Sequence, residues 1–252
     1  MDGEDEKSQL KWAGENPWYC LATLYGESFF VDREVADKNR TAWNRWMVGG
    51  HLSPQWRSDL RQKGLPETDL TELDSNEKSD LCTRFAARLK RAGQPPPDPA
   101  QPIDFSQLRF VFFSSFRGFI FEQPVDFESA EFEQSADFTD AIFLGTADFG
   151  AAVFHGSADF RLSKFVDKAN FPSTFRSMAS FQNAVFDSTA NFEGGSFSGT
   201  ASFTGVKFSK DVDFRGSTFA KEVDFTSVTF SGTLDFFAQF SARLPVSVGV
   251  FP

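Results

Sequence analysis

The apolar positions in the second half of the chain follow a strict spacing, because phenylalanine recurs at alternating steps of five and six residues. The alternation runs from Phe105 to Phe171 and, after one shortened step to Phe175, continues to Phe236. Such steps fit no single face of an α-helix, and consecutive positions fall on opposite parities, which excludes one face of a strand. The pattern predicts a coil that turns a corner every five or six residues and stacks on the next coil, which is a solenoid.

Each side of such a coil points one large side chain inward. The residue two positions earlier is usually small or aliphatic, as at Ala136, Ala158 and Val212, and would fill the narrow space beside each ring. Two units of five plus six residues give one coil, so the ladder predicts about six coils and a rod on the order of 30 Å long. The expected core ladder includes Phe127, Phe138, Phe149, Phe160, Phe192, Phe203, Phe214 and Phe225.

Helix start and stop signals recur before the ladder. Asn16-Pro17 and Ser53-Pro54 can each open a helix, and Asp74 with Glu77 can form a capping box. We expect helices after Pro17, from about residue 32 to 47, after Pro54 and from about 76 to 92. The five tryptophans of this region are expected in a shared core or docking face rather than on a nucleic-acid stacking surface.

The chain therefore divides into five parts. We expect a flexible N-terminus at 1–11, an α-helical region at 12–93 and a stiff proline-rich linker at 94–103. The β-solenoid follows at 104–240, and residues 241–252 form a C-terminal cap or tail. As an alternative to capping, this tail joins two rods end to end in a homodimer.

Composition and charge narrow the functional classes. The 34 phenylalanines against 2 tyrosines indicate that a periodic structure demands one side-chain shape. The net charge of −10 argues against direct binding to a nucleic-acid backbone and favours a basic partner or an uncharged one. The N-terminus lacks the pattern of a signal peptide, and no stretch reaches the length of a membrane span, so we expect a cytoplasmic protein.

Several segments place a small residue and then Asp or Asn directly before the ladder phenylalanine. The segments 136–138, 147–149 and 158–160 read Ala-Asp-Phe, and 169–171 and 190–192 read Ala-Asn-Phe. At these residues the chain resembles the pentapeptide-repeat family, and the resemblance covers slightly more than half of the chain. It implies a mainly β fold, a right-handed four-sided β-helix, here preceded by the small α-helical region. The alternation of five and six, with phenylalanine at every centre, departs from the family's constant step of five.

The aspartates before the ladder phenylalanines allow three interpretations. Asp126, Asp137, Asp148 and Asp159 could bond the turn backbone, as Asp and Asn commonly do. Alternatively they form an interaction surface that imitates the charge of a nucleic-acid backbone, as the resemblance to family members that bind DNA gyrase implies. Cation binding is the weakest interpretation, because carboxylates on a flat wall diverge.

Enzymatic chemistry would have to lie in the helical region, because a rod filled with rings offers no catalytic cavity. Cys20, Cys82 and His51 are candidates there, for an enzyme or a redox protein, but Cys20 lies among apolar neighbours that favour an inert thiol. His155 is expected on the surface. We therefore predict no catalytic, cofactor or metal residues, and a non-enzymatic scaffold that binds a protein partner whose identity the sequence does not reveal.

Overall fold

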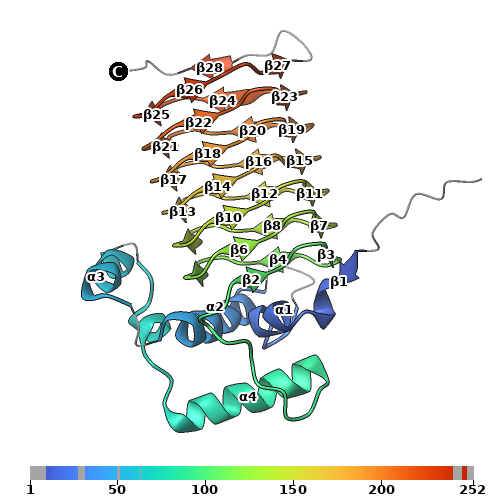
Figure 1. The fold of residues 1–252 in the computed structure, drawn as a ribbon, viewed down its shortest axis with the longest axis vertical. Coiled ribbons are helices and arrows are strands. Elements are labelled where there is room, and N and C mark those ends of the chain that lie inside the picture. The colour runs from blue at the N-terminus through green and yellow to red at the C-terminus, as the bar shows by residue number, and fades with distance from the viewer. Residues whose placement is uncertain (1–9, 28–31, 50–51, 63, 241–245, 249–252) are drawn as a thin grey trace, which may run out of the picture.

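The computed structural model describes residues 10–27, 32–49, 52–62, 64–240 and 246–248. A rod of stacked strands stands on the helices, with β28 at the end of the rod that is far from them (Figure 1). Residues of the predicted N-terminus before position 10, and His51, lie outside the described residues.

The helical region forms at the predicted signals. α1 begins after Asn16, whose side chain accepts a hydrogen bond from the amide of Tyr19, and α4 begins with the complete capping box of Asp74 and Glu77. Two short 3₁₀ helices, η1 and η2, complete the region. The bounds are η1 (Ala13–Glu15), α1 (Pro17–Ala22), α2 (Arg33–Val48), α3 (Pro54–Gln62), η2 (Glu67–Leu70) and α4 (Ser75–Leu89).

The rod is a parallel β-solenoid with four sheets, which we call walls 1 to 4 in chain order. Each coil passes through all four walls, so walls 1 and 3 face opposite directions, as do walls 2 and 4. The predicted four-sided solenoid is confirmed. Wall 1 comprises β2 (Ile103–Asp104), β6 (Val125–Asp126), β10 (Ala147–Asp148), β14 (Ala169–Asn170), β18 (Ala190–Asn191), β22 (Val212–Asp213) and β26 (Leu234–Asp235). Wall 2 comprises β1 (Lys11–Trp12), β3 (Leu108–Phe110), β7 (Glu131–Phe132), β11 (Val153–Phe154), β15 (Thr174–Phe175), β19 (Ser196–Phe197), β23 (Thr218–Phe219) and β27 (Gln239–Phe240).

The other two walls have the same construction. Wall 3 comprises β4 (Ser114–Ser115), β8 (Ala136–Asp137), β12 (Ala158–Asp159), β16 (Ala179–Ser180), β20 (Ala201–Ser202), β24 (Val223–Phe225) and β28 (Val246–Val248). Wall 4 comprises β5 (Ile120–Phe121), β9 (Ile142–Phe143), β13 (Lys164–Phe165), β17 (Val185–Phe186), β21 (Lys207–Phe208) and β25 (Thr229–Phe230).

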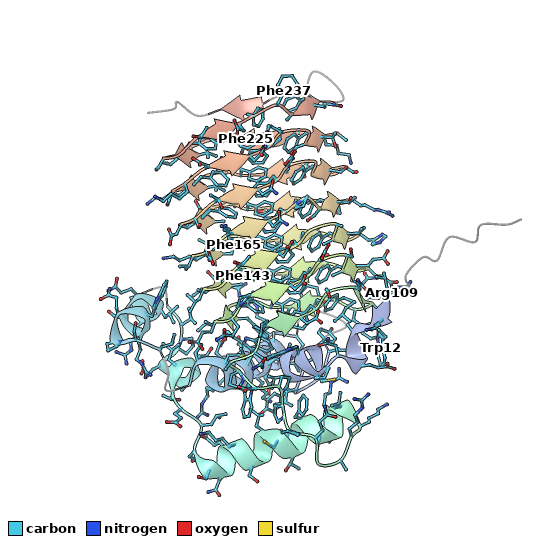
Figure 2. The ribbon with its side chains drawn as sticks, in the orientation of Figure 1. Trp12, Arg109, Phe143, Phe165, Phe225 and Phe237 are labelled. Atoms are coloured by element: carbon cyan, nitrogen blue, oxygen red, sulfur yellow. The ribbon has the colours of Figure 1, made fainter. Side chains whose placement is uncertain are left out.

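Phenylalanine rings fill the rod in four columns, one behind each wall (Figure 2). Within a column the rings stack almost parallel: the ring centroids of Phe138 and Phe160 lie 4.7 Å apart at an interplanar angle of 3°. Between columns they meet edge to face, as Phe149 and Phe160 do at 86°. The small residues two positions earlier are buried beside them. All eight core phenylalanines named from the sequence lie inside the rod, from Phe127 to Phe225.

The alternation of five and six residues follows from two kinds of corner. Five residues separate the rings at the corners from wall 1 to wall 2 and from wall 3 to wall 4. At these corners the second residue after the phenylalanine has a positive φ, for example Asp140, Leu162 and Gly205. The other two corners need one residue more. The predicted shortened step is a wall 1 to wall 2 corner, where Ser173 donates its amide hydrogen bond to the carbonyl of Phe171 across Pro172.

The N-terminal end of the rod is closed by the helical region. Asn44 of α2 accepts a hydrogen bond from the amide of Ile120 at 2.8 Å and donates to the carbonyl of Gly118 at 3.0 Å, and the indole of Trp43 donates to the carbonyl of Ile120 at 3.0 Å. These two side chains satisfy backbone groups that a preceding coil would otherwise bond. β1 pairs with β3 of wall 2, and Asn16 donates a hydrogen bond to the carbonyl of Asp104 in wall 1. The helical region therefore also supplies partners to the first strands of walls 1 and 2.

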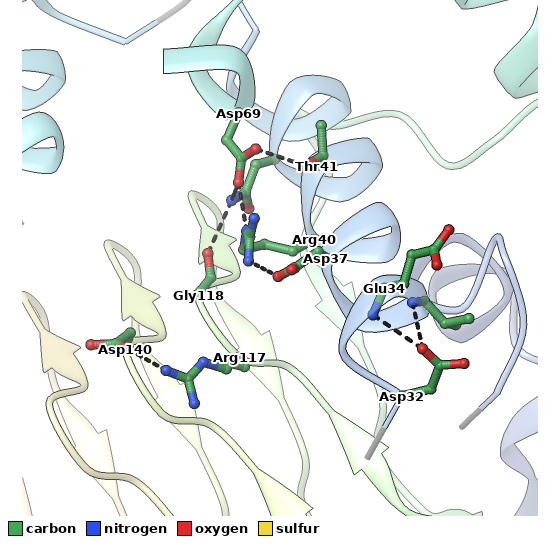
Figure 3. A network of polar contacts seen from close by, with 11 residues as sticks. Asp32, Glu34, Asp37, Arg40, Thr41, Asp69, Arg117, Gly118 and Asp140 are labelled. Carbon is green, nitrogen blue, oxygen red and sulfur yellow. Dashed lines mark hydrogen bonds and ion pairs between the residues drawn. The ribbon is translucent and has the colours of Figure 1, made fainter. Parts of the chain in front are cut away.

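A buried carboxylate holds this closure in place (Figure 3). Asp69 of η2 is fully buried and accepts hydrogen bonds from Arg40 and Thr41 at 2.7 Å each, with Asn44 at 3.4 Å. Arg40 is also paired with Asp37. Because Asn44 contacts both Asp69 and the first coil, η2, α2 and the rod are joined by one polar network.

The segment between the helices and the rod is attached to both. Residues 94–102 contain no helix or strand, and the Trp46 indole donates a hydrogen bond to the carbonyl of Pro97 at 2.8 Å. Regular structure of the rod begins at Ile103, one residue before the expected boundary. Trp18 and Trp43 lie in a core that is continuous with the first rings, since Trp43 stacks on Phe119 at 5.2 Å.

The C-terminal end has a different construction. The ladder extends one position further than the sequence spacing suggested, because Phe240 follows Phe236 by a second four-residue step and stacks on Phe219. β28 pairs with β24 and adds one strand to wall 3. Phe236, Phe237 and Phe240 remain 39%, 83% and 36% exposed, and Phe237 projects at this end in Figure 2.

Candidate interaction surface

The four aspartates singled out from the sequence lie on two opposite walls. Asp126 and Asp148 are partners in the register of wall 1, and Asp137 and Asp159 are partners in wall 3. A single flat partner would therefore contact only one of the two pairs.

Each of these carboxylates bonds the backbone of its own corner. The amide two residues further along donates to the carboxylate at 2.7 Å for Asp126 and Asp148, 2.8 Å for Asp137 and 3.1 Å for Asp159. Asn191 accepts the same bond at 2.8 Å. The geometry is that of an Asx turn, which an asparagine supports as well as an aspartate.

The electrostatic surroundings distinguish the carboxylates. Partial burial raises the pKa of Asp126, and the neighbouring carboxylates of Asp148 and Asp104 raise it further. Burial also raises the pKa of Asp137. Asp159, in contrast, is paired with Arg161 at 2.6 Å. The wall 1 aspartates therefore repel one another, whereas wall 3 supplies a cation.

Net charge is concentrated on wall 1. We counted the outward residues directly before and after each ladder phenylalanine. Wall 2 carries Arg109, Glu131, Glu133 and Arg176; wall 3 carries Asp137, Asp159, Asp224, Arg117 and Arg161; and wall 4 carries Glu122, Lys164, Asp187 and Lys207. Wall 1 carries Asp104, Asp126, Glu128, Asp148, Glu193, Asp213 and Asp235 against the single cation Arg215. Three walls are close to neutral and one is strongly acidic.

The acidic character of wall 1 is strongest over its first three coils. Asp104, Asp126, Glu128 and Asp148 make no ion pair with any residue in the described ranges. Above them, the side-chain amide of Asn170 donates to Asp148 and that of Asn191 donates to Asn170, each at 2.8 Å, so two neutral amides interrupt the column. Further up, a hydrogen bond from Arg215 lowers the pKa of Asp213.

The candidate residues for chemistry in the helical region are not assembled into a site. Cys20 is buried, its thiol donates to the carbonyl of Gly14, and burial raises its pKa, which disfavours the reactive thiolate. Cys82 lies half-buried on α4. Within the described part of the chain, no three His, Cys, Asp or Glu side chains are grouped in a way that could hold a metal ion.

His155 faces outward, as expected, but it is not simply solvated. Its Nε2 lies 2.6 Å from a carboxylate oxygen of Glu131, and its Nδ1 lies 3.3 Å from Arg176. All three residues stand in neighbouring coils of wall 2. The sequence showed only an isolated histidine, because the 21 to 24 residues that separate these partners become neighbours only when the coils stack.

A groove of about 690 Å³ runs between α2 and α4. Ala42, Leu73 and Leu81 form part of its floor, and its lining includes no histidine or cysteine. Its charges are largely paired: Arg45 binds Glu77 at 2.6 Å, and Asp80 binds Arg84 at 2.7 Å. The groove offers apolar contact area but no nucleophile and base that converge.

Comparison with known proteins agrees with the architecture. A family model for pentapeptide repeats matches residues 116–171 and 196–238 with nine copies. These two segments of the rod therefore consist of repeats of the pentapeptide-repeat type. No curated protein and no solved structure matches the chain. In the described residues, no helix is both long and apolar enough to cross a membrane.

Proposed function

We propose that this chain is a non-enzymatic scaffold that binds a basic protein surface through wall 1 of its solenoid. The observation that carries the proposal is the concentration of unpaired carboxylates on that wall. Parallel strands hold these charges at the fixed spacing of neighbouring coils, so a complementary surface would be both steered and placed in register.

Other features support a binding role over catalysis. The rings occupy the interior of the rod, and the outward side chains of different walls point in different directions, so the four walls do not converge on a substrate. Free thiols at Cys20 and Cys82 suit a reducing compartment, in keeping with the cytoplasmic location that we propose.

The test removes charge and keeps the turn. In the full chain, Asp104→Asn, Asp126→Asn, Glu128→Gln and Asp148→Asn together neutralise the first three coils of wall 1, and Asn191 shows that asparagine supports the same corner. The control removes the three carboxylates that we counted on wall 3, through Asp137→Asn, Asp159→Asn and Asp224→Asn. Partners are captured from native extract and compared by mass spectrometry. We expect the wall 1 variant to capture at least about tenfold less of the partner than the unchanged chain, while the control captures as much as the unchanged chain. Equal capture by both variants would refute the proposal.

A second candidate function is imitation of a nucleic-acid backbone. The first three coils of wall 1 favour this function, because their carboxylates form no ion pair with any described residue. If it holds, the full chain should compete with duplex DNA for a DNA-binding enzyme such as gyrase, and the neutralised wall 1 variant should not. Absence of competition at micromolar concentrations would leave protein binding without mimicry.

We also infer that two copies associate through their C-terminal ends, because three large rings are exposed there. Deletion of residues 241–252 should halve the mass measured by light scattering if this tail mediates the contact. Phe237→Asp should do the same, and Met178→Asp, an exposed position on the side of the rod, serves as the control. A monomeric wild-type chain would exclude the dimer.

A further inference from the structure

Outward-facing aliphatic side chains are concentrated on wall 4. Most outward positions of the rod carry polar residues, as expected for a surface in water. Directly before and after the ladder phenylalanines, walls 1 and 3 carry no Val, Ile or Leu in the described residues, and wall 2 carries Val111 and Val153. Wall 4 carries Ile120, Ile142, Leu144, Val166 and Val185. The five follow one another over four consecutive coils and form an apolar stripe.

The chain covers the lower part of this stripe with its own helices. Ile120 is fully buried under α2, where Trp43 and Asn44 bond its backbone. Ile142 is only 1% exposed although it faces outward. α3 lies beside wall 4 in Figure 1, and the ring of its Trp56 lies 5.2 Å from the Lys164 ammonium. Wall 4 is thus a wall on which helices pack.

The stripe continues beyond α3, where no helix of the described residues covers it. In the register of wall 4, Val185 follows Lys164 and is followed by Lys207. Val166, Val185 and Trp56 are half-buried, and the Trp56 ring lies against Lys164, which is the register partner of Val185. These three apolar side chains border Lys164, and a tryptophan that is only partly covered is a frequent anchor in protein interfaces.

The charges around these side chains have a positive excess. Lys164 is paired with Asp187 at 3.0 Å, and Asp167 accepts a hydrogen bond from Thr146. Lys168 and Lys207 are exposed and make no ion pair within the described ranges. Two ammonium groups and the single carboxylate of Asp167 therefore border the apolar side chains without ion pairs among the described residues, on a protein that is acidic overall.

We call the surface formed by Trp56, Val166 and Val185, with Lys168 and Lys207 at its border, the wall 4 ledge. We propose that the wall 4 ledge binds an amphipathic helix of a partner protein, and that the apolar stripe of this helix is flanked by acidic residues. Continuity with the α3 interface specifies a helix, and the unpaired lysines specify acidic flanks. The inference rests on the proposed role of the rod in protein binding, but it uses a different wall and a partner of opposite charge.

The probe is a synthetic amphipathic helix with leucine and phenylalanine along one face and glutamates on both sides. A matched peptide has lysines in place of the glutamates. Binding to the full-length protein is measured by fluorescence anisotropy, and the contact is mapped by hydrogen exchange of β13 and β17. We expect the acidic peptide to bind at least about tenfold more tightly than the basic one.

Two sets of variants locate the contact. Val166→Asp together with Val185→Asp should weaken the binding of the acidic peptide by about tenfold or more. Val153→Asp, at the equivalent outward position of wall 2, should leave this binding unchanged. Lys207→Glu should weaken it several-fold, and the exposed Lys221→Glu is its control. Circular dichroism verifies that each variant is folded, and Lys207→Glu tests the proposal even if the double valine variant does not fold.

The inference is wrong if the acidic peptide does not bind at millimolar concentration, if both peptides bind equally, or if Lys207→Glu and the valine changes leave its affinity unchanged. If only the basic peptide binds and the neutralised wall 1 variant loses it, the proposed function stands and the ledge inference fails. If the acidic peptide binds at the ledge while the wall 1 variant and the wall 3 control capture the partner equally, the ledge inference stands and the proposed role of wall 1 fails.

Discussion

The two ends of the rod differ although the coils that reach them are built from the same repeat. At the N-terminal end, Phe105 is fully buried, because Trp43 stacks on it and α2 closes the coil. At the C-terminal end, Phe236 in the same column is 39% exposed. The repeat itself therefore does not determine how the rod ends. Termination depends on the segment that is attached to the last coil.

The closed end also shows what termination requires. A strand edge needs partners for its backbone amides and carbonyls, and a ring column needs an apolar surface on its last member. α2 supplies both from adjacent residues, the indole of Trp43 for the rings and the amide of Asn44 for the backbone. At the open end, β26, β27 and β28 add a last strand to walls 1, 2 and 3, and among the described residues no strand follows β25 on wall 4.

The largest expected effect separates the middle of the rod from its open end. Phe160→Asp places a charge among stacked rings and should cost on the order of 5 kcal/mol or more, which abolishes folding of the rod. In the separated protomer, Phe237→Asp at the open end should change the unfolding free energy by less than about 0.5 kcal/mol, because this side chain is 83% exposed. Urea unfolding followed by circular dichroism compares the two. A cooperative β-rich transition in Phe160→Asp would contradict the packed-ring core.

The closed end should depend on Asn44. Asn44→Leu leaves the edge groups of Gly118 and Ile120 without partners and removes one hydrogen bond from buried Asp69, so we expect a loss of about 3 kcal/mol. Asn76→Leu, at an exposed position of α4, is the control. Chemical unfolding monitored by tryptophan fluorescence measures both. Equal stability of the two variants would mean that the amide bonds do not close the rod.

A stabilising change in the rod tests whether the two ends unfold together. Leu162 has a φ of 60° and is 52% exposed, so Leu162→Gly relieves backbone strain and loses little burial. We expect a gain of about 1 kcal/mol, and none for Leu162→Ala, which keeps the strain. Because the core is continuous, thermal unfolding should shift upward for the helical and the β signals alike. A shift of the β signal alone would show that the helical region unfolds independently.

The smallest expected effect is a difference in acid response. Hydrogen bonds from Arg45 and the Asp74 backbone lower the pKa of Glu77 to about 2, so its stabilisation of the helical region is lost as pH falls from 4.5 toward 2. The raised pKa of Asp126 has the opposite effect on stability. The Asp126 carboxylate takes up a proton more readily in the folded rod than in the unfolded chain, so its contribution to stability rises as pH falls toward 3.8. Glu77→Gln should reduce the acid loss of helical signal between pH 5 and 3. An unchanged acid profile would exclude Glu77 as its source.

The local features were readable from the sequence because they depend on neighbours in the chain. The ring positions, the Asn16 and Asp74 caps and the shortened step at Pro172 all follow from spacing and residue type. The positive φ at Leu162 was not predictable, since leucine rarely adopts it. Phe240 was missed because a four-residue step breaks the alternation on which the prediction relied.

The sequence by itself determined the repeat, the stacking of coils and the outward position of the aspartates, because each coil repeats one local rule. Only the tertiary structure decided which residues of different coils and helices meet. It placed Asn44 on the edge of β5, joined His155 to Glu131, concentrated the unpaired carboxylates on wall 1 and placed Trp56 beside Lys164 of wall 4. These contacts depend on the number of residues in every preceding coil and on where the helices dock, which no local pattern specifies.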